Sequence, residues 1–66
     1  MQVEVYLNDA DDAPRWTLEF AAIPRVGEYV ALDAGGLAMY YDVVEVWYRQ
    51  VATGSMQACI GVKLDD

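Results

Sequence analysis

Met39-Tyr-Tyr-Asp-Val-Val-Glu-Val-Trp-Tyr-Arg-Gln-Val51 is the stretch that decides the fold. It is rich in β-branched and aromatic residues and contains no glycine or proline, which is typical of a β-strand. A straight strand of this length would reach roughly 40 Å at about 3.3 Å per residue. A domain of 66 residues accommodates such a strand only if the strand bends. Because Val43, Val44 and Val46 break the regular alternation, we predict a β-bulge or sharp bend near residues 42–44.

Alternating apolar and polar residues on either side of this stretch predict four further strands. Turn-forming residues separate them, and the loop over residues 8–14 is long and acidic. The expected strands cover residues 2–7, 15–20, 28–32, about 38–51 and 56–64. A short helical turn at residues 21–23 is the one helix that we allow for. The pattern predicts one all-β domain over residues 1–66, a small five-stranded antiparallel barrel with one long bent strand.

Composition restricts both the chemistry and the partners of the chain. It has 66 residues, a net charge of −7, no histidine and a single cysteine, Cys59. One thiol forms neither an internal disulfide nor a zinc site built from several cysteines. A free thiol and a start without a basic or apolar leader favour a cytoplasmic location. The negative charge disfavours direct binding to nucleic acid and to anionic membranes, and it fits a basic protein surface.

Three segments resemble small SH3-like β-barrel proteins of bacteria and phages. They are Ile23-Pro-Arg-Val-Gly-Glu-Tyr-Val30, Tyr41-Asp-Val-Val-Glu-Val-Trp47 and Cys59-Ile-Gly-Val-Lys-Leu64. The resemblance covers about two thirds of the chain. It implies an SH3-like fold and a phage or mobile-element origin, and it implies no activity.

The sequence offers no pattern typical of catalysis. Ser55 lies in an expected turn, and Cys59 sits between apolar residues with no histidine in the chain to act as a base. An EF-hand loop that starts at Asp9 would need glycine and glutamate where Pro14 and Phe20 stand. Gly35-Gly36 lacks the lysine and the helix of a phosphate-binding loop. We therefore expect no enzyme, no cofactor and no metal.

Two functions remain open at this level. The first is a non-catalytic inhibitor or adaptor that binds a basic, nucleic-acid-binding protein, in its sharpest form as a nucleic-acid mimic. Small acidic phage proteins, anti-CRISPR proteins among them, often act in this way. Carboxylates on one face of a strand recur about every 6–7 Å, which is similar to the spacing of backbone phosphates. The candidate partner-binding residues are Glu4, Asp9, Asp11, Asp12, Glu19, Asp42, Glu45, Tyr40 and Tyr48.

The second function is a structural or assembly module. In that case exposed aromatic residues and an open sheet edge join the barrel to a second copy, as a homodimer, or to a larger phage or bacterial complex. The carboxylates then only keep the protein soluble. Mimicry predicts that the carboxylates gather in a stripe on one face. Assembly predicts scattered carboxylates and an apolar patch around Tyr40, Trp47 and Tyr48.

Overall fold

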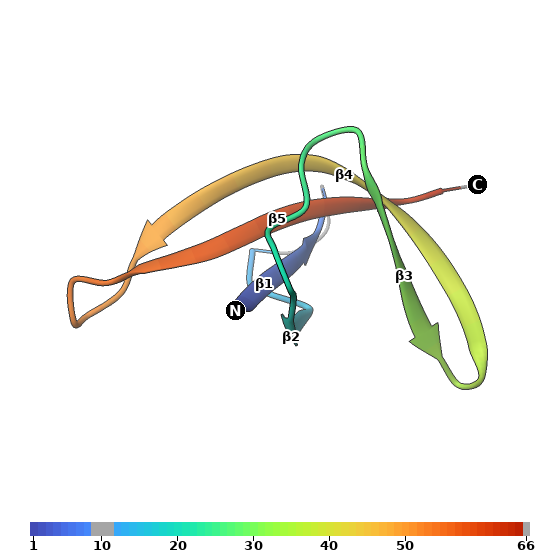
Figure 1. The fold of residues 1–66 in the computed structure, drawn as a ribbon, viewed down its shortest axis with the longest axis horizontal. Helices are drawn as coiled ribbons and strands as arrows, with labels where there is room; N and C mark the ends of the chain where they lie inside the picture. Colours follow the sequence, from blue (N-terminus) through green and yellow to red (C-terminus); the bar gives the residue numbers. More distant parts are fainter. Residues whose placement is uncertain (9–11, 66) are drawn as a thin grey trace.

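The computed structural model describes residues 1–8 and 12–65, and these form an all-β domain (Figure 1). The strands are β1 (Gln2–Leu7), β2 (Trp16–Glu19), β3 (Tyr29–Ala34), β4 (Leu37–Gln50) and β5 (Met56–Leu64). The described residues contain no helix, so the helical turn that the sequence allowed at residues 21–23 does not form. Consistent with this, no membrane-spanning helix is found in the described part of the chain.

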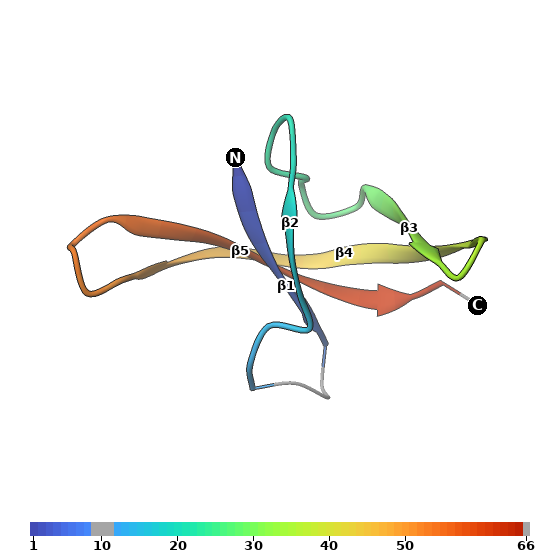
Figure 2. The same ribbon diagram turned by 90° about the horizontal axis from the view of Figure 1, so that it is seen from below.

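All five strands belong to one sheet in the order β2-β1-β5-β4-β3. The β1–β2, β3–β4 and β4–β5 pairs are antiparallel, as expected. The β1–β5 pair is parallel, so the sheet is mixed and the prediction of a fully antiparallel sheet is wrong. β2 and β3 each pair with one strand and form the two edges of the sheet. The sheet curls without joining these edges, so it is a half-barrel. Figure 2 shows β1 and β2 crossing the long β4–β5 ribbon at a steep angle.

β4 contains the predicted bulge. Val43 faces Val62 and Glu45 faces Gly61, so Val44 is an extra residue with no counterpart on β5. An extra residue bends the strand and increases its twist. β4 accordingly arches over the molecule in Figure 1 and pairs with β3 through its first half and with β5 through most of its length. At the β3–β4 turn, Gly35 and Gly36 both have positive φ, which is the conformation of a tight two-residue hairpin turn.

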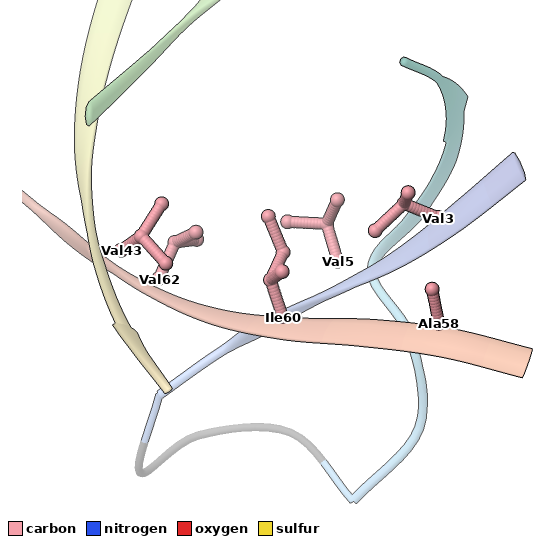
Figure 3. Close-up of a cluster of buried hydrophobic side chains, with 6 residues drawn as sticks. All are labelled: Val3, Val5, Val43, Ala58, Ile60 and Val62. Carbon is pink, nitrogen blue, oxygen red and sulfur yellow. The ribbon is translucent and has the colours of Figure 1, made fainter. Parts of the chain in front are cut away.

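The core lies on the inside of the curled sheet. Its fully enclosed members share one face of three central strands and point toward the same side (Figure 3); they are Val3, Val5, Val43, Ala58, Ile60 and Val62. Trp16 and Phe20 pack against this cluster and are half-buried. We call this side of the sheet the core face and the opposite side the outer face.

On the side of β4 that β3 covers, the last backbone hydrogen bonds come from the connection between β2 and β3. The N–H of Gly27 donates to the carbonyl of Val43 (3.1 Å), and the N–H of Val43 donates to the carbonyl of Glu28 (2.8 Å). Among the described residues, no backbone group bonds to this edge of β4 after Val43. The C-terminal half of β4, orange at the left of Figure 1, thus has β5 on one side and an open edge on the other.

Candidate functional site

The carboxylates of the strands all lie on the outer face. Their cross-strand partners place them opposite to the core positions: Glu4 faces Cys59, Glu19 faces Gln2, Asp33 faces Ala38, Asp42 faces Lys63 and Glu45 faces Gly61. Side chains alternate between the two faces of a strand, and the core occupies the other face. The strand carboxylates thus share one face, which is the usual result for a sheet whose other face is apolar.

Glu4 is held inside a polar cluster and is only 8 % exposed. Its carboxylate accepts hydrogen bonds from Arg49 Nε (2.8 Å) and Arg49 Nη2 (2.6 Å), which is a bidentate ion pair. It also accepts from the Tyr6 hydroxyl (3.1 Å) and lies 3.6 Å from Cys59 Sγ. The hydrogen bonds from Arg49 hold the pKa of Glu4 below its usual value, against the opposing effect of burial. Glu4 therefore stabilises the fold and leaves little surface for a partner.

The same cluster determines the chemistry of Cys59. Its side chain is fully buried, and burial together with the nearby Glu4 carboxylate raises the pKa of the thiol. A thiol with a raised pKa is a poor nucleophile at neutral pH because the thiolate is the reactive form. Cys59 thus fits a structural role on the outer face.

Two further predicted acids lie beside cations. Glu19 pairs with the N-terminal ammonium of Met1, and its carboxylate also accepts from the Gln2 amide (3.2 Å). Asp42 is half-buried and stands directly across from Lys63 on β5. Together with the Glu4–Arg49 pair, these cations interrupt the stripe of negative charge. The outer face therefore lacks the uninterrupted line of carboxylates that a long phosphate-like stripe requires.

A shallow hollow of about 450 Å³ lies on the outer face where β1, β4 and β5 meet. We call it the outer hollow; it is lined by Tyr6, Leu7, Asn8, Asp12, Glu45, Trp47 and Gly61. The rings of Tyr6 and Trp47 lie 5.0 Å apart and are tilted by 46°. Asp12 and Glu45 add exposed carboxylates. An aromatic wall with carboxylates beside it suits a cationic side chain, which is attracted by both groups.

Gly61 forms the floor of the outer hollow because it has no side chain. A Cβ at this position would stand 3.3 Å from Glu45 Oε2 and 3.5 Å from Trp47 Cζ3. Glu45 and Trp47 therefore lean across β5 over the glycine. A second depression, lined by Val26, Glu45, Val46 and Trp47, adjoins the open edge of β4. Glu45 and Trp47 belong to both depressions.

The two candidate tyrosines lie on different faces. Tyr40 is 48 % exposed on the outer face, where its ring meets that of Tyr29 edge-on at 5.9 Å. Tyr48 faces Ala58 on the core face, yet it is 54 % exposed because β4 extends past the enclosed part of the core. The structure thus does not bring Tyr40 and Tyr48 together.

The acidic loop is described only in part. Asp9 and Asp11 lie outside the described residues, and Asp12 borders the outer hollow. No group of three or more potential metal ligands occurs among residues 1–8 and 12–65. Of the loop's predicted acids, the described Asp12 contributes to the outer hollow, which we take as the candidate site.

Of the residues that line the outer hollow, sequence reasoning listed Asp12 and Glu45 as partner-binding residues and named Trp47 only for an assembly patch. It missed Tyr6, Leu7, Asn8 and Gly61. A signal existed, since alternation along residues 2–7 and 56–64 already placed Tyr6 and Gly61 away from the core. Their meeting depends on the parallel β1–β5 pair, which the pattern does not reveal. No protein-family model, curated protein or solved structure matches the chain.

Proposed function

We propose that the protein is a non-catalytic binding module that docks a basic segment of another protein at the outer hollow. The observation that carries the proposal is that the adjacent rings of Tyr6 and Trp47 line one hollow together with the carboxylates of Glu45 and Asp12. A lysine or arginine side chain placed there stacks on an aromatic ring and approaches carboxylates. The net charge of −7 adds long-range attraction and speeds association with a basic surface.

Two features support binding rather than catalysis. Among the described carboxylates, Glu4 has a shifted pKa; Arg49 already binds it, and it does not line the outer hollow. The outer hollow is shallow, and it contains carboxylates, aromatic rings and an amide without a nucleophile beside a base. Aromatic residues inside a polar rim are typical of protein-binding hot spots.

The experiment is affinity capture from nuclease-treated bacterial lysate at low and high salt, comparing the wild type with two charge variants. Glu45→Lys reverses a charge inside the outer hollow, whereas Asp65→Lys changes the net charge equally at an exposed residue that follows β5 and does not line the outer hollow. We expect salt-sensitive capture of a basic protein by the wild type and by Asp65→Lys, and loss of capture with Glu45→Lys. Equal capture by both variants would show that the partner does not bind at the outer hollow.

The finer form of the proposal is inhibition of a nucleic-acid-binding protein, as in phage anti-CRISPR proteins. It is supported by the shared face of the strand carboxylates and weakened by the cations among them. Competition decides it: DNA or RNA would displace the captured partner if both occupy one surface. An SH3-like relationship remains part of this proposal and rests on the sequence segments that resemble that family.

Self-association is the second candidate, and a specific observation favours it. β4 carries an open edge beside exposed apolar side chains, Tyr48 and Met56 among them. An open edge readily pairs with another strand. This feature is independent of the outer hollow and leads to a separate inference.

A further inference from the structure

The open edge of β4 presents backbone groups in a definite order. Near the end of β4 the N–H of Val51 donates to the carbonyl of Ser55 (2.9 Å), so the backbone N–H and C=O of Val51 point toward the β5 side. Bonding direction alternates along a strand. The N–H and C=O groups of Val46, Tyr48 and Gln50 therefore point toward the open edge. None of these edge-directed backbone groups has a hydrogen-bond partner among the described residues.

The charge of this part of the chain differs from that of the whole protein. Residues 46–63 contain no aspartate or glutamate and include two cations, Arg49 and Lys63. This segment is thus positively charged, and all eleven carboxylate side chains belong to the rest of the chain. Two copies that meet along this edge bring together their least acidic segments, and electrostatic repulsion is smallest there. A basic partner, in contrast, gains little from this edge.

We propose that two copies of the chain pair through their open β4 edges, antiparallel and around a two-fold axis at Tyr48. In this register Tyr48 faces the partner's Tyr48, and Val46 faces the partner's Gln50. All the edge-directed backbone groups of Val46, Tyr48 and Gln50 then form hydrogen bonds between the copies. The same patch is used on both copies, which is the arrangement of most symmetric dimers.

Side chains on both faces agree with this register. On the outer face Trp47 lies opposite the partner's Arg49, and the arrangement occurs twice because of the symmetry. Within one copy, Arg49 reaches Glu4 of β1 and Trp47 leans over Gly61 of β5, so both side chains lean away from the open edge and neither obstructs it. On the core face the two Tyr48 rings meet. Glu45 lies opposite the partner's Val51, so no like charges face each other.

The length of the edge also fits the register. Pairing with β3 and its preceding loop ends at Val43, and the bulge follows at Val44. The open segment therefore begins at Glu45 and ends at Gln50, where the β4–β5 turn begins. Antiparallel pairing about Tyr48 places each copy's turn beside the loop that contains the other copy's Val26. The interface is small, so we expect reversible, concentration-dependent association.

The experiment measures the molar mass of the intact protein by light scattering and sedimentation over a concentration series. Tyr48→Lys and Tyr48→Glu each place like charges opposite each other on the two-fold axis, which is unfavourable for strand pairing. Their equimolar mixture places opposite charges there. Tyr40→Lys makes the same substitution at another exposed tyrosine that is remote from the open edge. Circular dichroism verifies that each variant keeps its strands.

We expect dimers for the wild type and for Tyr40→Lys, monomers for each Tyr48 variant alone, and dimers again for the mixture. A wild type that stays monomeric at the highest concentration would overturn the inference. Dimers of Tyr48→Lys as strong as those of the wild type would place the interface elsewhere. Monomers in the mixture would overturn the two-fold register. The outcome of the lysate capture does not affect this test.

Discussion

Replacing Ile60 by alanine tests whether the core lies where the curled sheet places it. Ile60 is fully buried on β5, the central strand, between Val5 of β1 and Val46 of β4. The substitution removes three carbons, and at about 0.8 kcal/mol per buried methylene the transfer loss is about 2.4 kcal/mol. The neighbouring valines are stiff and fixed on paired strands, so a remaining cavity adds to the loss. We expect a total of about 3–4 kcal/mol.

This loss is large for so small a domain. At about 0.05–0.15 kcal/mol per residue, the whole free energy of unfolding is about 3–10 kcal/mol. Urea denaturation, followed by circular dichroism at one fixed protein concentration, gives the difference. Leu64→Ala is the matched control, since Leu64 lies on the same strand and face but is 40 % exposed. We expect it to cost about 1 kcal/mol. Equal losses for the two variants would refute a core centred on β5.

Three further predictions follow from the contacts described above. Arg49 lowers the pKa of Glu4, so this carboxylate stabilises the fold above its ordinary pKa and loses that effect as pH falls through the lowered value. Denaturation curves between about pH 5 and pH 2 should therefore depend less on pH in Glu4→Gln than in the wild type, and parallel curves would contradict the assignment. Trp16→Ala should cost about 2–4 kcal/mol by urea denaturation, because the half-buried ring packs on the core and meets Tyr41 edge-on at 5.5 Å; a loss below about 1 kcal/mol would place it on the surface. Cys59 should react with iodoacetamide in the native state far more slowly than in denaturant, as followed by mass spectrometry, and equal rates would mean that the thiol is accessible.

The two proposals use different parts of the outer surface and share Trp47. The outer hollow lies on the β5 side of this ring, and the open edge lies on its other side. A dimer would place two outer hollows on one continuous sheet. A partner with two basic segments would then bind more tightly than a single segment does. The Tyr48 variants separate these effects, because they remove pairing and leave the residues that line the outer hollow unchanged.

The strands themselves were predictable from local sequence. Alternation and turn residues located all five, and the uneven run around Val44 predicted the bulge. These features depend only on residues that are close in the sequence. Side chains alternate between the two faces at every step along a strand, and Gly35-Gly36 favours a tight turn whatever the rest of the fold is. The alternation along residues 2–7 and 56–64 also puts Val3, Val5 and Ile60 on the apolar sides of their strands, and these sides form the core.

Only the tertiary structure decided which strands are neighbours and which edges stay open. Alternation is identical for parallel and antiparallel neighbours, so residues 2–7 carry no signal that β1 runs parallel to β5. That pairing brings Tyr6 beside Trp47 over Gly61 and buries Glu4 against Arg49. The local pattern also does not say where β3 stops covering β4. Composition determined the charge of the protein, and long-range strand pairing determined where that charge is exposed.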